Sequence, residues 1–113
     1  DFWGSHHLRL PGGEKEEHHG HKWEVIAEVC AERLDKIGTV MDFHKLEAFL
    51  EEIIEKVEGK HLNTVAEFQD LNPSAENVAK YIYEKLELKL PNRLELKSVR
   101  VMEEENCWAK FYK

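Results

Sequence analysis

The histidines are the residues of this sequence whose type and spacing could do chemistry. Five of the seven lie within the first 21 residues, and two of them, His19 and His21, are two residues apart. On a β-strand, side chains at this spacing point to the same face. Neutral imidazole is a good zinc ligand, and such a pair would supply two of the three protein ligands of a catalytic zinc site. The spacing alone is equally compatible with two half-buried histidines that are held by hydrogen bonds and bind no metal.

A third ligand would come from His6 or His7. Adjacent residues of a strand point in opposite directions, so only one of the two can face the site. His6 shares its parity with Phe2 and Leu8, which indicates the inward face. We therefore expect a zinc ion bound by His6, His19 and His21.

The histidine pair opens a stretch that alternates like an antiparallel strand with one buried face. From His19 to Ala31 the odd positions are apolar after the two histidines, and the even positions include the charged Lys22, Glu24 and Glu28, interrupted by Ile26 and Cys30. Residues 1–8 predict a shorter strand. The segment 9–18, which contains Pro-Gly-Gly followed by charges, predicts an exposed loop.

Two helices are predicted in the middle of the chain. Asp42 can cap the first, Gly59 is a natural stop, and the apolar positions follow a 3.6-residue period. These positions are Phe43, Leu46, Phe49, Leu50, Ile53, Ile54 and Val57. The second helix is predicted to open at Asn72-Pro73, with the proline in its first turn. Its buried positions are predicted to be Val78, Ala79, Ile82 and Leu86.

The end of the chain predicts two more strands, over 94–103 and 107–112. The order β-β-α-α-β-β then defines an α+β fold, in which two helices pack on one face of an antiparallel four-stranded sheet. We expect residues 1–113 to form a single domain. The edge strands of such a sheet often pair between subunits. His44 and His61 lie near the helical segments, where we expect surface positions.

The composition excludes several classes of function. Acidic residues outnumber basic ones 23 to 16, which gives a net charge of −7. We expect no nucleic-acid binding, because that usually needs a basic stripe. No apolar run approaches the roughly 20 residues that cross a membrane, and no signal peptide is visible. Cys30 and Cys107 do not make a disulfide framework, so we expect reduced thiols in a cytoplasmic protein.

Five stretches of the chain together resemble the 6-pyruvoyl-tetrahydropterin synthase and 6-carboxytetrahydropterin synthase family. They are FWGSHHL (2–8), HGHKWEV (19–25), GTVMDFHKL (38–46), NPSAENVAKYIYEKL (72–86) and VRVMEE (99–104), in the family's order and spacing. Phe2, His6 and Leu8 match the family pattern of Phe, three residues, His, one residue and Leu. The resemblance implies that this histidine and both histidines of the HGH stretch bind zinc.

The resemblance also implies substrate-binding residues. The family anchors the pterin ring through a Glu in a V-x-V-x-E motif, which is Glu103 here. A carboxylate can accept two hydrogen bonds from the amino and ring N–H groups of a pterin. A solvated charge at a strand end is the alternative, but Glu103 is expected to share a face with Val99 and Val101. Ser74 falls where the family has a Thr or Ser near the pterin, although it could equally serve to start its helix.

The sequence departs from the family at the catalytic residues. Well-studied members have a catalytic Cys shortly before HGH, but the loop GGEKEEHHGH contains none. An Asp-His pair of the family becomes Glu58 and Gly59. Some branches have a Glu three residues before HGH, where Glu16 stands, and resemble dihydroneopterin aldolases in cleaving the side chain to 6-hydroxymethyl-dihydropterin. Glu16, Lys15 and Glu58 are therefore the catalytic candidates, with a charged surface loop as the alternative for the first two.

The resemblance implies a zinc-dependent lyase that acts on dihydroneopterin triphosphate or a related dihydropterin. The bulk of the family favours the synthase reaction, whereas the missing Cys and His favour aldolase-like cleavage. A non-catalytic zinc- or pterin-binding protein is the other hypothesis, and the intact histidines and Glu103 argue against it. Family members form a tunnel-like barrel, the T-fold, in which the sheets of three subunits join and two trimers stack. This implies a homo-hexamer with active sites between subunits.

Overall fold

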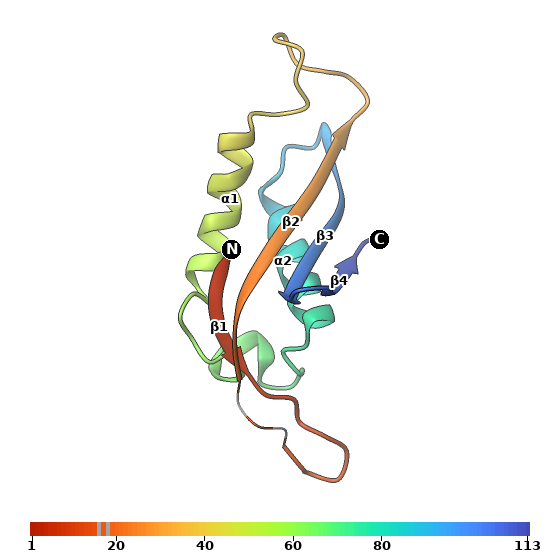
Figure 1. Ribbon diagram of the computed structural model, residues 1–113. Coiled ribbons are helices and arrows are strands. Elements are labelled where there is room, and N and C mark those ends of the chain that lie inside the picture. The colour runs from red at the N-terminus through yellow and green to blue at the C-terminus, as the bar shows by residue number, and fades with distance from the viewer. Residues whose placement is uncertain (16, 18) are drawn as a thin grey trace.

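The computed structural model of this chain describes residues 1–15, 17 and 19–113 (Figure 1). The elements are β1 (Phe2–His6), β2 (His19–Ala31), α1 (Phe43–Glu55), α2 (Ala75–Lys89), β3 (Leu94–Glu104) and β4 (Cys107–Phe111). Two short 3-10 helices, Leu62–Thr64 and Ala66–Phe68, lie between α1 and α2. The predicted order of elements is confirmed, and the predicted strand ranges agree with it closely.

The four strands form one antiparallel sheet in the order β1-β2-β3-β4. Helix α2 packs on β3 and β4, and α1 packs beside α2. Both helices lie on the same side of the sheet, which leaves its other side without a helix (Figure 1). The α+β fold expected from the sequence is therefore confirmed.

Strand β2 shows the alternation that the sequence predicts. Trp23 is fully buried, and the odd positions beyond it pack against the same core. The even positions Lys22, Glu24, Ile26 and Glu28 are exposed. This parity matters for function, because it directs His19 and His21 to the side of the sheet that carries the core.

Helix α1 begins as predicted but ends earlier. Asp42 is its N-cap, and the Oδ1 atom of Asp42 accepts a hydrogen bond from the backbone N–H of His44 (2.9 Å). The expectation that Phe43 faces the core is wrong, since its side chain is 76% exposed. A side chain at the first helical position points back beyond the helix N-terminus. At the other end the helix stops at Glu55 and tightens into a turn that still buries Val57.

Helix α2 begins at Ala75 rather than at Pro73, so the prediction of a proline in its first turn is wrong. Ser74 is the N-cap, and its Oγ atom accepts a hydrogen bond from the backbone N–H of Asn77 (3.2 Å). The serine hydroxyl accepts a hydrogen bond from a backbone N–H in the first turn, and a proline side chain has no such acceptor. The helix therefore starts after Ser74 rather than at Pro73. The four positions predicted to be buried, Val78, Ala79, Ile82 and Leu86, are all buried.

The segment after α1 runs along the outer edge of β1. The backbone N–H of Gly59 donates to the Trp3 carbonyl (2.6 Å), and that of Ser5 donates to the Lys60 carbonyl (3.1 Å). An isolated parallel bridge joins Ser5 to His61. Part of the β1 edge is therefore covered by this chain itself, whereas β4 pairs with β3 alone among the described residues.

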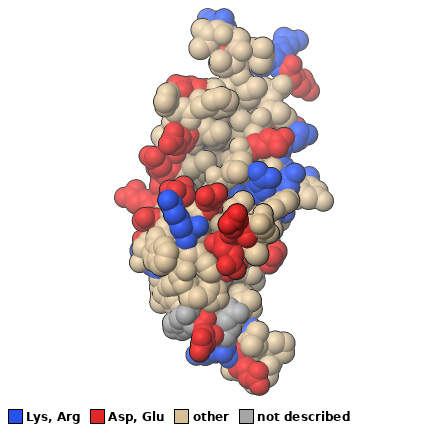
Figure 2. Space-filling model, in the orientation of Figure 1, with Lys and Arg blue, Asp and Glu red and all other residues tan. Residues whose placement is uncertain are grey.

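The surface carries charges of both signs. On the face shown in Figure 2, acidic side chains gather over α1, and basic ones lie beside β3 and β4. Among the described residues, no helix combines the length and the apolar character that crossing a bilayer requires.

Candidate metal centre

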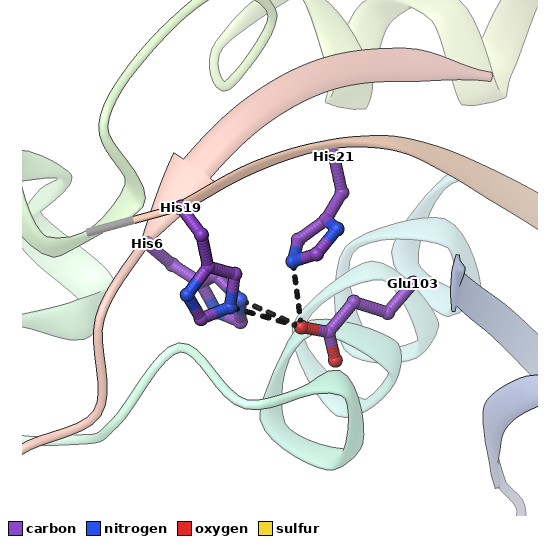
Figure 3. A group of neighbouring side chains, drawn as sticks. All are labelled: His6, His19, His21 and Glu103. Atoms are coloured by element: carbon purple, nitrogen blue, oxygen red, sulfur yellow. Dashed lines mark hydrogen bonds and ion pairs between the residues drawn. The ribbon is translucent and has the colours of Figure 1, made fainter. Parts of the chain in front are cut away.

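The structure brings His6, His19, His21 and Glu103 together at one end of the sheet (Figure 3). His6 and His19 are direct partners in the register of β1 and β2. His21 lies two residues further along β2, on the same face. Glu103 comes from β3, which is the other neighbour of β2. The strand parities inferred from the sequence are therefore correct for all four residues.

A single oxygen of Glu103 contacts all three imidazoles. The Oε1 atom is 2.8 Å from Nε2 of His6, 3.0 Å from Nε2 of His21 and 3.4 Å from Nε2 of His19. His6 is buried, whereas the side chain of His19 is 36% exposed. The group therefore opens to solvent on the side of His19.

Hydrogen bonds at the outer ring nitrogens fix two of the imidazoles. Nδ1 of His6 donates to the carbonyl oxygen of Pro73 (2.7 Å), and Nδ1 of His19 donates to that of Glu17 (3.1 Å). A carbonyl only accepts, so Nδ1 carries the hydrogen and Nε2 of the neutral ring presents a lone pair. This arrangement, in which the second ring nitrogen donates to a carbonyl, is usual for metal-binding histidines.

The third imidazole, that of His21, also favours the neutral form, but because of burial rather than a hydrogen bond to a carbonyl. Nε2 of His21 is buried and, among the described residues, makes no hydrogen bond, although Oε1 of Glu103 lies 3.0 Å away. Burial lowers the pKa of the His21 imidazole; Glu103 opposes this effect, and His19 and His6 add to it. The neutral form, which is the form that binds metals, is therefore favoured.

These four side chains fit a metal ion. The Nε2 atoms of the three imidazoles and a carboxylate oxygen face one another, and these ligand atoms all lie within 4.8 Å of one another. Acceptors that converge in this way repel each other unless a proton or a cation lies between them. The donor set, of nitrogen and oxygen atoms only, suits zinc among several divalent metals.

Aromatic side chains support the centre from below. Trp23 is fully buried, packs edge-on against His6 with ring centroids 5.0 Å apart, and donates its Nε1–H to the Gly4 carbonyl (3.0 Å). Phe2 stacks on Trp23 in turn. These contacts limit the rotation of His6, because its ring is held by an aromatic neighbour as well as by Pro73.

On the opposite face of β2, the indole of Trp3 lies across Gly20, the residue between the two histidines of HGH. A Cβ atom at Gly20 would be only 2.5 Å from Cζ2 of Trp3. A glycine between the two histidines is therefore required by this close approach, not by an unusual backbone angle.

A second polar group lies beside the first, and the sequence did not predict it. Nδ1 of His7 is 2.9 Å from Nε2 of His61, and Nδ1 of His61 is 2.8 Å from Oγ of Ser5. Oδ1 of Asn63 accepts a hydrogen bond from the backbone N–H of His7 (2.9 Å). The surface position expected for His61 is wrong in part, since it is half-buried in this group, whereas His44 is exposed as expected. The only sign of this group in the sequence is the His and Asn of the EGKHLN stretch. Their hydrogen-bond partners are more than 50 residues away, so the stretch alone does not predict the contacts.

The remaining predicted site residues lie elsewhere. Glu58 accepts a hydrogen bond from the backbone N–H of Trp3 (3.0 Å). Trp3 is three residues before His6, or about 10 Å along a strand. Lys15 is exposed in the loop and forms an isolated bridge with Arg9. Glu16 lies outside the described residues.

Ser74 is close to the centre only through its backbone neighbour. Its hydroxyl caps α2, as one of the two sequence-based interpretations held, and the preceding Pro73 carbonyl binds His6. A role near a pterin stays a prediction for Ser74.

An antiparallel sheet with two helices on one side, and a three-histidine, one-carboxylate group at one end, is the arrangement expected for a pterin synthase fold. The chain matches the model of the 6-pyruvoyl tetrahydropterin synthase family over residues 1–113, and it belongs to this family.

Similar proteins agree with this assignment. Dihydroneopterin monophosphate aldolase of Pyrococcus furiosus is 34% identical over 102 residues, which cover 90% of this chain and 82% of that protein. The human 6-pyruvoyl tetrahydrobiopterin synthase is 36% identical over 90 residues, or 78% of this chain and 61% of the human protein. The structure of Caenorhabditis elegans 6-pyruvoyl tetrahydropterin synthase matches with a TM-score of 0.83 at 21% identity, covering 99% of this chain and 89% of that one, which supports the fold.

Proposed function

We propose that this protein is a zinc-dependent lyase that acts on a dihydropterin. The observation that supports it most directly is the convergence of His6, His19 and His21 on one point. Catalytic zinc commonly has three protein ligands and one position for water or substrate. Zinc bound there would act as a Lewis acid that polarises the side-chain oxygens of the substrate.

Glu103 is the proposed anchor of the pterin ring. Its carboxylate can accept two parallel hydrogen bonds from the amino and ring N–H groups of a pterin. The side chain is about one-fifth exposed and lies within 3.4 Å of the three imidazole rings. A ring bound by this carboxylate would therefore lie beside the metal centre.

Of the reactions within this class, we favour cleavage of the bond between the first and second side-chain carbons. A base takes the proton of the hydroxyl on the second carbon, which becomes an aldehyde carbonyl as the bond breaks. The electron pair of the bond passes to the first carbon and the adjoining C=N of the ring. A proton then returns to the first carbon, which leaves 6-hydroxymethyl-dihydropterin.

This reaction requires a general base and acid but no thiol. The loop before HGH contains no Cys, and it offers Glu16 and Lys15 as candidates for proton transfer. The similarity to the Pyrococcus furiosus aldolase supports the same choice. Glu58 stays a weaker candidate, because in this chain it binds the backbone of β1.

The synthase reaction is the second candidate. It is favoured by the family as a whole and by the 36% identity to the human 6-pyruvoyl tetrahydrobiopterin synthase. The two reactions give different products from related substrates, so product analysis distinguishes them. A non-catalytic pterin-binding protein would give neither product.

The decisive experiment is mass spectrometry of the products formed by the zinc-loaded protein. Dihydroneopterin, its monophosphate and its triphosphate would be offered separately, with His19→Ala protein as the control that lacks a metal ligand. We expect 6-hydroxymethyl-dihydropterin from at least one substrate and none with the variant. A 6-pyruvoyl or 6-carboxy product would favour the synthase, and no product from any substrate would refute the lyase proposal.

We also propose a homo-hexamer built from two trimers. In this arrangement the sheets of three subunits join edge to edge, and β4 offers one such edge. Active sites between subunits would allow a residue of one chain, such as Glu58, to serve the metal centre of another.

A further inference from the structure

The position of Glu103 is that of a metal ligand. In a tetrahedral zinc site, ligand atoms about 2.0–2.1 Å from the metal lie about 3.3 Å from one another. The distances from Oε1 of Glu103 to the Nε2 atoms of His6, His21 and His19 are 2.8, 3.0 and 3.4 Å, so the last matches that separation and the first two are somewhat shorter. Figure 3 shows these contacts meeting at one carboxylate oxygen.

The backbone at Glu103 allows this side chain to be directed at the histidines. The register of β3 and β4 shifts between Met102 and Glu104, so that Met102 pairs with Trp108 and Glu104 with Cys107. Glu103 is the extra residue of this irregularity. Such bulges re-aim a side chain and are frequent beside active sites. Glu103 is also the last inward-facing residue of β3, and its long side chain has room to rotate because it is partly exposed.

We propose that Glu103 is the fourth ligand of the metal while no substrate is bound, and that it leaves the metal when a pterin ring enters. This inference rests on the proposed metal site. A carboxylate that binds the ring through both oxygens must direct both of them at the ring. It cannot at the same time keep Oε1 among the three imidazoles.

Two consequences follow from this exchange. The resting metal is closed by four protein ligands, as in a structural site, and the ring opens it by removing one of them. Binding of the ring and loss of the carboxylate from the metal are then a single event. Water or a side-chain oxygen of the substrate can reach the metal only after the ring is in place.

Cobalt(II) in place of zinc provides a direct test, because its visible spectrum reports coordination number and ligand type. The samples are wild type, Glu103→Ala and the control Glu104→Ala, each loaded with Co²⁺ alone. Glu104 is the neighbouring residue, carries the same charge and is exposed. We expect one and the same four-coordinate spectrum for wild type and the control, and shifted bands for Glu103→Ala because water replaces the carboxylate.

Competition with a chelator measures the zinc affinity and so tests the role of Glu103 independently of the spectrum. Loss of even an outer partner of a metal site typically costs 10–100-fold in affinity, so we expect Glu103→Ala to bind zinc at least about tenfold more weakly. Glu104→Ala should bind zinc like wild type. The circular dichroism of all three proteins should match, which excludes unfolding as the cause.

The exchange itself is tested with a pterin that lacks the side chain and so offers no side-chain hydroxyl to the metal. Added to wild type, it should move the Co²⁺ spectrum towards that of Glu103→Ala, and it should leave the spectrum of Glu103→Ala nearly unchanged. An unaltered spectrum and unaltered zinc affinity in Glu103→Ala would overturn the inference and leave the three-histidine site standing. A wild type that binds no Co²⁺ or zinc would refute the metal site, and the proposed function with it.

Discussion

Replacement of Gly20 by alanine should test how the sheet holds the two histidines of HGH. The new Cβ atom would be 2.5 Å from Cζ2 of Trp3 and 3.2 Å from two further indole atoms. Ordinary contacts between carbon atoms are about 3.5–4.0 Å, so Trp3 or the strand must shift by about 1 Å. Overpacking of this kind typically costs about 1–3 kcal/mol. Because Trp3 is half-exposed and can move outward, we expect the lower end of this range.

The assay is thermal unfolding of the metal-free protein, followed by circular dichroism at one fixed concentration. A loss of about 1 kcal/mol corresponds to roughly 4–8 °C in Tm for a domain of this order of size. The double variant Trp3→Ala/Gly20→Ala removes the clash, so alanine at position 20 should cost little in a Trp3→Ala background. A Gly20→Ala protein as stable as wild type, or an equal loss in both backgrounds, would refute the reasoning.

The remaining predictions concern the metal, the start of α2 and the assembly. His19→Ala should lose most of the roughly one zinc per chain expected for the site, measured by elemental analysis after mild chelation; full retention would show that His19 is not a ligand. Ser74→Ala should lower the stability by about 1 kcal/mol through loss of the N-cap, measured by urea unfolding, whereas Ser74→Asn, which keeps a capping oxygen, should be close to wild type. Light scattering at micromolar concentration should give a trimer or hexamer, and a monodisperse monomer would contradict the proposed assembly.

Much of the fold could be predicted because it depends on local patterns. The alternation in β2 and β3 gave both the strands and the faces of His19, His21 and Glu103, since side chains of a strand alternate without exception outside bulges. Alternation, helical periodicity and the turn residues between them also gave the order of the elements. Even the choice of His6 over His7 followed from parity and was matched by the structure.

The errors came from contacts that no local pattern encodes. The 3.6-residue period placed Phe43 in the core, but the period does not show where the sheet beneath a helix ends. His61 was expected at the surface because it lies near a helical segment. Its partners His7 and Ser5 are 54 and 56 residues away in the sequence, so no local pattern shows these contacts.

The hydrogen bond between His6 and Pro73 links the metal centre to helix α2. Pro73 immediately precedes the N-cap Ser74, so the imidazole of His6 has the proposed metal on one nitrogen and the start of α2 on the other. A ligand that binds the native state suppresses the local openings of the segments that form its site. Metal loading should therefore slow hydrogen exchange in the first turn of α2, although none of the proposed ligands belongs to that helix. Hydrogen exchange at the start of α2 would therefore report whether the metal centre is occupied.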